Sequence, residues 1–348
     1  MKYEWNLSET NFTKDKWTVF SCFACGWWST MWYKLAWFDV IWCNEIDPRM
    51  NACYIKNHNP KFNYLEDIRI FKERQDLPKE LYNLDILDGS PPCSSFSMAW
   101  NREKDWGKEK KFREWQELQI LDTLFFDFID LAKKLQPKIV IAENVKGLMI
   151  WNAQDYMNKI IIAFNEAWYK VDYKLLNWAS MWVPQRRERV FFYAIRNDLV
   201  NKVGTIDLFW DLPKLNLEFN QKKITYKEIE SPYREEKWYH IPEWVLPYWE
   251  KIQPWRSCSD VHPKWHFFQE LKLSPDEVLP TLRAGSNSYY HYKDKRRLFD
   301  EEILKWWSFP LDYDLNWSKA IYIVGMSVPP LMTYWIANEV YKQWICNL

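Results

Sequence analysis

The residues best suited to covalent chemistry lie in the segment Gly89-Ser90-Pro91-Pro92-Cys93. Two consecutive prolines cannot continue a regular strand, so they place the thiol of Cys93 on a rigid turn. A thiolate is a strong nucleophile, but a free thiol has a pKa of about 8.5 and needs an electropositive setting to ionise at neutral pH. Arg187 and Arg189 are candidates for that setting. The pattern therefore predicts nucleophilic catalysis by Cys93.

Other polar residues also follow apolar, strand-like runs. The segment Phe23-Ala24-Cys25-Gly26-Trp27-Trp28 follows the first run, where a glycine-rich loop normally lets a nucleotide-like ligand approach the backbone. Glu45 ends the second run, a position from which a carboxylate can accept hydrogen bonds from ribose hydroxyls. Asp67 ends a third run and Glu143 follows a later one. Each feature is a weak signal alone, but together they indicate one ligand site.

A largely parallel α/β sheet would bring these residues together. Apolar runs alternate with helical patterns in the first half of the chain, as βαβ units require. Ligands of an open α/β sheet bind at the carboxyl ends of its strands, where all the candidates fall. Strands are predicted at 18–23, 40–43, 84–88, 138–142 and 190–195, and helices at 29–36, 48–58, 118–135, 158–167 and 331–344.

Composition places the chain among globular proteins of about two domains. The 348 residues are 48% hydrophobic and 27% charged, and 47 basic residues balance 47 acidic ones. No apolar run is long enough to span a membrane and the N-terminus does not resemble a secretion signal, so a cytoplasmic location is expected. Seven scattered cysteines suggest reduced thiols, and Cys22-x-x-Cys25 has no second pair at metal-ligand spacing, so no metal site is expected.

The order of these motifs resembles that of the cytosine-C5 DNA methyltransferases. The resemblance covers nearly the whole chain except about 200–317, where such enzymes keep their target-recognition domain. It implies a Rossmann-like methyltransferase domain at 1–198 and 318–348 and a smaller recognition domain at 199–317. The matching segments are Phe23-Ala24, Asn44-Glu45-Ile46-Asp47, Glu66-Asp67-Ile68, Gly89-Ser90-Pro91-Pro92-Cys93, Glu143-Asn144-Val145, Gln185-Arg186-Arg187-Glu188-Arg189 and Gly325-Met326-Ser327-Val328-Pro329-Pro330.

The resemblance also implies a reaction. Cytosine C5 is a poor nucleophile, so a thiolate first adds to C6 and makes C5 enamine-like. By this resemblance Cys93 is the nucleophile, Glu143 acts on the base at N3, and Arg189 binds the cytosine O2. The expected supporting residues are Asn144, which orders the pocket, with Gln185 and Arg187. The target base must leave the duplex to reach Cys93, so base flipping is expected.

S-adenosylmethionine is the methyl donor that the resemblance implies. Phe23 would face the adenine, Ile46 would lie beside it, and Glu45 would bind the ribose. Asp67 would bind the adenine amino group and Pro91 would line the cofactor. The remaining expected cofactor residues are Ala24, Cys25, Gly26, Trp27, Ile68 and Ser327.

The expected partner is double-stranded DNA in a prokaryotic or phage-infected cell, with a cognate restriction endonuclease as a functional rather than physical partner. Residues 101–114 carry a net charge of about +2 and follow Cys93, where they favour phosphate contact. A second basic and aromatic segment, 289–297, lies in the expected recognition domain. Two alternatives stay open, an RNA cytosine methyltransferase and an inactive DNA-binding homologue.

One departure from the family pattern is the replacement of glycine by tryptophan. The chain has only 7 glycines but 25 tryptophans, whereas glycine ordinarily makes up about 7% of residues. Trp27 and Trp28 occupy positions where the family's first motif has glycine. Other tryptophans at positions typical of glycine are Trp32, Trp37, Trp100, Trp115, Trp168, Trp182 and Trp335. One hypothesis is that UGA codons, read as tryptophan, encode glycine in the natural genome. If the tryptophans are genuine, the inactive homologue gains weight.

Overall fold

The computed structural model describes residues 3–24, 28–92, 123–149, 153–204, 215–267, 269–282, 285, 287–316 and 318–348. The chain divides into two compact units. The sheet unit contains Phe12–Asn177, Glu188–Glu218 and Thr333–Leu348, and the second, which we call the irregular unit, contains Met1–Asn11, Trp178–Arg187 and Phe219–Met332. These units differ from the boundaries expected at 198/199 and 317/318, because short segments far apart in the sequence join the irregular unit.

The sheet unit is built on seven strands in the order β3-β2-β1-β4-β5-β7-β6. The first five strands in sequence pair in parallel, whereas β7 runs antiparallel to both β5 and β6. The mixed α/β fold predicted from the sequence is confirmed, with its mostly parallel sheet. The strands are β1 (Thr18–Cys22), β2 (Asp39–Glu45), β3 (Phe62–Leu65), β4 (Ile86–Gly89), β5 (Ile139–Val145), β6 (Tyr169–Asn177) and β7 (Glu188–Arg196).

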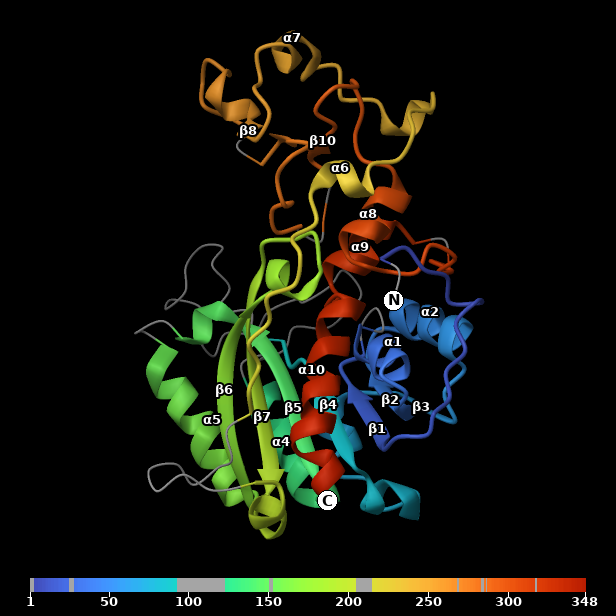
Figure 1. Ribbon diagram of the computed structural model, residues 1–348, viewed down its shortest axis with the longest axis vertical. Coiled ribbons are helices and arrows are strands. Elements are labelled where there is room, and N and C mark those ends of the chain that lie inside the picture. The colour runs from blue at the N-terminus through green and yellow to red at the C-terminus, as the bar shows by residue number, and fades with distance from the viewer. Residues whose placement is uncertain are drawn as a thin grey trace. The chain divides into compact units, whose positions relative to one another are not determined.

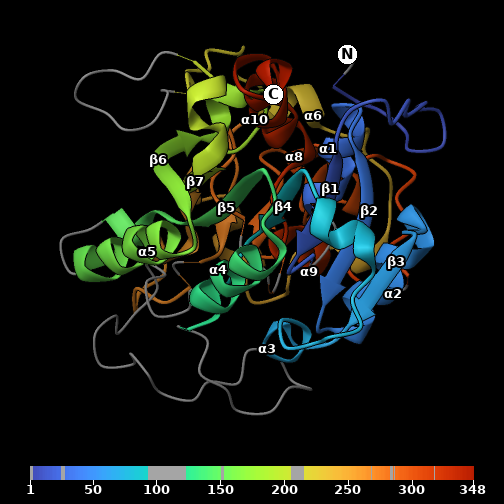
Figure 2. The same cartoon turned by 90° about the horizontal axis from the view of Figure 1, so that it is seen from below.

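Helices cover both faces of this sheet (Figure 2). Helices α3 (Ile68–Phe71), α4 (Leu124–Leu135) and α5 (Gln154–Glu166) pack on one face, where a continuous apolar core includes Phe20, Leu87 and Phe128. Helix α1 (Trp28–Leu35) and the part of α10 (Pro330–Gln343) that belongs to this unit lie on the other face. Helix α2 (Pro48–His58) contacts β2 and β3.

Local sequence explains the element that follows β2. The Asp47 carboxylate accepts hydrogen bonds from the backbone N–H groups of Arg49 and Met50, and Pro48 occupies the first turn of α2, where its missing N–H costs nothing. Asn59 ends the helix with a left-handed φ of 41°. These signals fix α2 at the residues predicted from the sequence.

Strand β6 is the longest strand that the sequence analysis did not predict. It pairs with β7 over its whole length and forms one edge of the sheet. Lys170, Asp172 and Lys174 alternate with apolar residues in it, and most of its side chains are only partly buried. Such charged edge strands lack the continuous apolar run that identifies the central strands.

The irregular unit has little regular structure, as the sequence predicts for this stretch. Three two-residue strands form a small sheet in the order β10-β9-β8, and a small core gathers Val245, Trp249, Cys258 and Tyr290. Its elements, shown in Figure 1, are α6 (Tyr226–Ile229), α7 (Leu246–Trp249), β8 (Arg256–Ser257), β9 (Leu271–Lys272), β10 (Tyr289–Tyr290), α8 (Asp300–Trp306) and α9 (Ala320–Gly325).

Residues Ala320–Asn347 are long and apolar enough, by composition, to be a candidate membrane span. However, 78% of the apolar window is buried within the protein. Such burial is typical of the core helix of a soluble protein. Short 3-10 helices complete the structure at Lys79–Asn83, Lys146–Met149, Trp178–Met181, Asn197–Lys202, Lys237–Tyr239, Cys258–Asp260 and Ile345–Asn347.

Candidate active site

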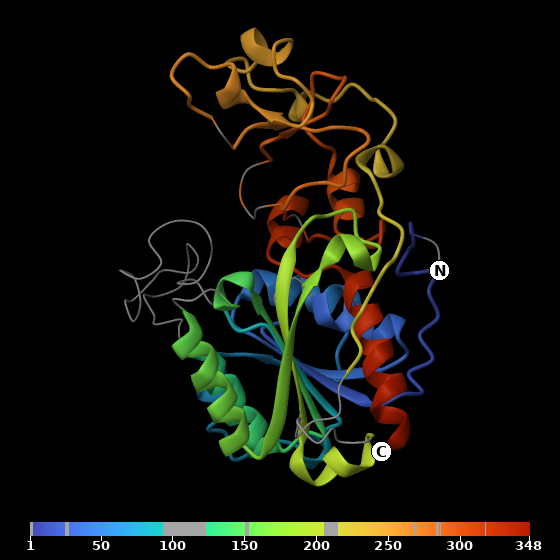
Figure 3. The ribbon, with the colours of Figure 1, turned by 60° about the vertical axis from the view of Figure 1, so that its left-hand side comes forward.

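The carboxyl ends of five parallel strands bring most of the predicted residues to one edge of the sheet. Because β1 to β5 run in the same direction, the residues that follow them share this edge (Figure 3). Phe23 follows β1, Glu45 ends β2, and Asp67 follows β3. Pro91 follows β4, and Glu143 lies near the end of β5.

Glu143 and Arg189 form a buried ion pair. The Nε atom of Arg189 lies 2.9 Å from Oε1 of Glu143, and the two side chains are only 16% and 7% exposed. The antiparallel register explains the contact, because Glu143 pairs with Phe191 while Arg189 pairs with Val145 two residues further along. Glu143 and Arg189 are thus diagonal neighbours on the same face of the sheet.

The guanidinium of Arg189 stays charged at neutral pH. Burial lowers the pKa of the Arg189 guanidinium from its ordinary value, and the Glu143 carboxylate opposes that shift. An arginine nevertheless stays protonated throughout the physiological range. Removing Glu143 would leave the buried guanidinium of Arg189 without its partner.

The segment that leads to Cys93 is joined to this pair. The Ser90 hydroxyl donates a short hydrogen bond to Oε2 of Glu143. The Asn144 amide donates to the carbonyl oxygen of Pro91 at 3.1 Å, while its Oδ1 accepts from the Val145 N–H at 2.8 Å. Asn144 is 3% exposed, so the contact is shielded from water. These bonds hold the end of β4 against the end of β5.

Ser90 is the site residue that sequence reasoning overlooked. It was noticed only as part of the motif before Cys93. The spacing offers no signal for its bond to Glu143, because the two residues are 53 positions apart and meet only when β4 and β5 pair.

The residues expected at the cofactor ribose lie at the end of β2. Glu45 is 3% exposed, and its Oε1 accepts hydrogen bonds from the backbone N–H groups of Ile46 at 2.9 Å and Asp47 at 2.8 Å. These bonds fix the orientation of the carboxylate. The adjacent Ile46 side chain is 39% exposed. An exposed apolar side chain next to an oriented carboxylate suits a nucleoside.

The Asp67 carboxylate is bound by Arg69. Its Oδ1 accepts from the Arg69 N–H at 2.8 Å, so Asp67 caps α3, and the Arg69 guanidinium contacts both carboxylate oxygens. Burial raises the pKa of this carboxyl, but the hydrogen bonds from Arg69 outweigh burial and hold the pKa below its usual value. Ile68 is buried beneath this turn with 3% exposure.

Phe23 turns the chain immediately after β1. Its φ is 54°, and its ring centroid lies 6.4 Å from that of Phe128. Ala24 is fully buried, and its N–H donates to the Asn44 carbonyl oxygen at 3.1 Å. The structure therefore brings the end of β1 next to the end of β2.

These strand ends suit an adenosine-containing cofactor such as S-adenosylmethionine. The oriented Glu45 carboxylate can accept hydrogen bonds from ribose hydroxyls, and Ile46 and Phe23 offer apolar surface for a purine ring. The Asp67 carboxylate can accept a hydrogen bond from an exocyclic amino group of the purine while it keeps its contact with Arg69. Within the described residues, no group of three or more histidine, cysteine, aspartate or glutamate side chains could hold a metal ion.

Three other expected residues belong to the irregular unit. The Gln185 side chain is fully buried. The Arg187 guanidinium lies over the rings of Trp178 at 4.6 Å and Trp307 at 5.5 Å. Ser327 is buried, and its hydroxyl donates to the Ile323 carbonyl oxygen at 2.7 Å. Each is well fixed within its own unit, and their roles in catalysis and cofactor binding stay predictions.

Several expected residues lie outside the described part of the chain. They include the predicted nucleophile Cys93 and the whole basic segment 101–114. The loop residues Cys25, Gly26 and Trp27 lie outside it as well. Their roles rest on the sequence alone.

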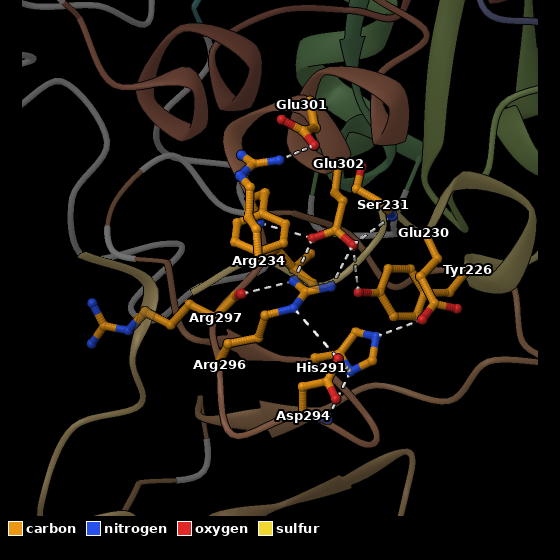
Figure 4. A network of polar contacts seen from close by, with 12 residues as sticks. Tyr226, Glu230, Ser231, Arg234, His291, Asp294, Arg296, Arg297, Glu301 and Glu302 are labelled. Carbon is orange, nitrogen blue, oxygen red and sulfur yellow. Dashed lines mark hydrogen bonds and ion pairs between the residues drawn. The ribbon is translucent and has the colours of Figure 1, made fainter. Parts of the chain in front are cut away.

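The second basic and aromatic segment, 289–297, is less exposed than the sequence predicts. Arg296 is 2% exposed and forms a bidentate ion pair with the fully buried Glu302, at 2.7 and 3.0 Å (Figure 4). Tyr289 and Tyr290 are buried too. The expectation of a phosphate-binding surface is therefore wrong for these three residues, because their side chains form the interior of the irregular unit.

Comparison of the sequence with known proteins identifies the family of the chain. The family of C-5 cytosine-specific DNA methylases matches residues 22–342. The chain is 34% identical over 324 residues to the Type II methyltransferase M.FnuDI of Fusobacterium nucleatum, a match that covers 85% of this chain and 86% of that protein. The chain therefore belongs to the C-5 cytosine-specific DNA methylase family.

Some relatives match over less of their length. The orphan methyltransferase M.Rho11sI of Bacillus phage rho11s is 31% identical over 219 residues, which cover 58% of this chain but 40% of that protein. Among solved structures, Dnmt2 methyltransferase of S. pombe has a TM-score of 0.61 at 15% identity, covering 94% of this chain and 98% of that one. This likeness supports the fold.

Proposed function

We propose that this protein transfers a methyl group from S-adenosylmethionine to C5 of cytosine in double-stranded DNA, through a covalent adduct with Cys93. The observation that carries the proposal is the Glu143–Arg189 pair, joined through Ser90 to the segment that leads to Cys93. Family membership supports the same reaction. The Type II relatives suggest a restriction-modification setting.

The reaction proceeds through addition and elimination. The Cys93 thiolate adds to C6 of the flipped cytosine while N3 gains a proton or a hydrogen bond, which makes C5 nucleophilic. S-adenosylmethionine supplies an electrophilic methyl group to C5. Loss of the C5 proton and expulsion of the thiolate then restore the aromatic ring and free Cys93.

The buried groups near Cys93 have distinct tasks. Glu143, as the acid at N3, must carry the proton in the transition state, and its contacts with Ser90 and Arg189 fix where its oxygens point. Arg189 has further N–H donors, which suit the cytosine O2. The bond from Asn144 to the Pro91 carbonyl positions the backbone two residues before Cys93.

The irregular unit is the proposed target-recognition domain. It includes most of the stretch that the family resemblance leaves uncovered, from Phe219 onward, and its fold is mostly loops around a small core. Loops on a supporting core are the usual means of reading base edges and phosphates. A DNA target is also what the description of the matching family indicates.

The reaction is tested by transfer of labelled methyl groups to cytosine-containing duplex DNA. The printed chain is compared with a Trp27→Gly/Trp28→Gly version and with Cys93→Ala in each background. Transfer that depends on Cys93 supports the proposal, while equal transfer by the Cys93→Ala protein contradicts it. An RNA acceptor methylated in preference to DNA would support the RNA alternative.

The covalent adduct has its own test. A duplex with 5-fluorocytosine at the target should stay attached to the protein, because fluorine at C5 blocks the loss of a proton that normally precedes release. Digestion and mass spectrometry should locate the DNA on Cys93. Methyl transfer without a trapped complex would contradict the covalent route.

A further inference from the structure

Tryptophan occurs unusually often where the backbone is left-handed. Twelve non-glycine residues in the described chain have positive φ, and five of them are tryptophan, although tryptophan makes up only 25 of 348 residues. In the same residues, only Gly204 is a glycine with positive φ. A Cβ atom crowds the neighbouring backbone at positive φ, so these positions favour glycine, and a bulky side chain is a marked outlier.

Trp37 occupies the position that glycine takes in a Schellman motif. The Trp37 N–H donates to the Lys34 carbonyl oxygen at 2.9 Å, and the Phe38 N–H donates to that of Tyr33 at 2.8 Å. These two bonds define the motif that ends α1, and φ at Trp37 is 70°. The Trp37 side chain is 48% exposed, so burial does little to offset the strain.

Trp168 ends α5 with a left-handed residue and with one of these two bonds. Its N–H donates to the Asn165 carbonyl oxygen at 3.0 Å, its φ is 72°, and its side chain is 51% exposed. The chain then enters β6 at Tyr169. The glycine-like cap expected here from the sequence is what the backbone adopts.

Three further tryptophans lie in turns of the irregular unit. Trp182 follows a 3-10 helix with a φ of 62°. Trp255 has a φ of 67°. Trp265 has a φ of 55° and is 80% exposed. Of these, Trp255 and Trp265 were not among the positions singled out from the sequence.

Other tryptophans behave as genuine aromatic core residues. Trp249 lies within α7, is 2% exposed, and has its ring 6.3 Å from that of Tyr290. Trp306 lies within α8, is fully buried, and packs edge-on against Tyr289 at 4.8 Å. Neither has a positive φ. Backbone conformation and burial therefore separate two groups of tryptophan in one chain.

We propose that UGA codons of this gene are decoded as glycine in its natural host, and that five positions printed as tryptophan are glycine in the natural protein: Trp37, Trp168, Trp182, Trp255 and Trp265. The inference rests on backbone geometry and does not depend on the proposed function. It has a consequence for that function, because the same decoding at Trp27 and Trp28 would give the loop after β1 the glycines of the family motif.

The first test is the codons of the natural gene. The five positions should be UGA, and Trp249 and Trp306 should be UGG. UGG at the five positions overturns the proposal. UGA at Trp249 and Trp306 as well would overturn the separation of the two groups by backbone conformation. Peptides of the protein purified from its natural host should carry glycine at the five positions, and tryptophan there would refute the decoding.

The second test uses variants of the printed chain. Trp37→Gly and Trp168→Gly should each raise the melting temperature, because glycine relieves the strained φ and removes an exposed ring. Trp249→Gly should lower it, because it opens a cavity in a small core. A lower melting temperature for both Trp37→Gly and Trp168→Gly would contradict glycine as the native residue at these helix ends.

Discussion

The guanidinium of Arg189 lies against the carboxylate of Glu143, with Nε and Oε1 2.9 Å apart, although 46 residues separate them in the chain. They meet because β7 runs back along β5 in antiparallel register. The pair thus places an acid and a fork of N–H donors beside the segment that carries Cys93. The first prediction concerns this acid.

Glu143→Gln should reduce methyl transfer by about 100-fold to 10,000-fold, the range typical of a lost general acid. Glutamine keeps the shape of the side chain but cannot deliver a proton. Because it also leaves the buried Arg189 without its counter-charge, transfer is measured at a temperature at which thermal unfolding shows the variant to be folded. Single-turnover transfer of labelled methyl groups measures the effect, and a DNA-binding assay should change far less. Glu166→Gln, at the exposed end of α5, is the matched control and should be inert. Full activity of Glu143→Gln would remove Glu143 from the mechanism.

Gly89→Ala should destabilise the protein by about 1 to 3 kcal/mol, the usual effect of an overpacked core. A Cβ atom at Gly89 would lie 2.6 Å from Cε2 of Phe128, inside the core of the sheet unit. Urea unfolding measures the change. Gly285→Ala has nothing within 4 Å of its new Cβ atom and should differ from the parent by less than about 0.5 kcal/mol. Equal stability of the two variants would contradict the close approach of α4 to β4.

Glu302→Gln should destabilise the irregular unit by up to about 3 to 5 kcal/mol, because it leaves the buried guanidinium of Arg296 with only the carboxylate of Asp294, 3.8 Å away, as a counter-charge. Glu302 also accepts hydrogen bonds from the Tyr226 hydroxyl and the Phe299 N–H, which the amide satisfies only in part. The control is Lys295→Ala, which removes an exposed ion pair with Glu250 and should cost less than about 1 kcal/mol. Thermal unfolding measures the loss of stability in both variants. A similar loss in both would show that the burial of the Arg296–Glu302 pair does not make it more important for stability than the exposed Lys295–Glu250 pair.

Asp67 should contribute a small stabilisation that disappears in acid. Its pKa is lower in the folded protein than in the unfolded chain, so the contribution is present above the unfolded pKa, near 4, and is lost as pH falls through the folded pKa. Asp67→Asn keeps a capping group but removes the charge, so it should cost less than about 1 kcal/mol at pH 7. The difference between parent and variant should shrink in denaturant titrations as the pH falls below the unfolded pKa and through the lower folded pKa. A difference that grows toward pH 3 would mean that the pKa shift has the opposite sign.

The sequence by itself determined the elements whose signals are local. Asp47 and Pro48 begin α2, apolar runs mark the central strands, and the motifs in family order identify the reaction class. Tryptophan at a helix end also predicted the left-handed backbone at Trp168. Each of these depends on residues close together in the chain, so their spacing carries the information.

Tertiary structure decided the contacts that depend on pairing and burial. The bond from Ser90 to Glu143 exists only because β4 and β5 pair, and the Glu143–Arg189 contact follows from antiparallel register. Arg296 looks like a surface cation in the sequence but is buried against Glu302, because α8 brings a carboxylate to it. Charge and residue type are properties of the sequence, whereas burial and the partner of each charge are set by how distant segments pack.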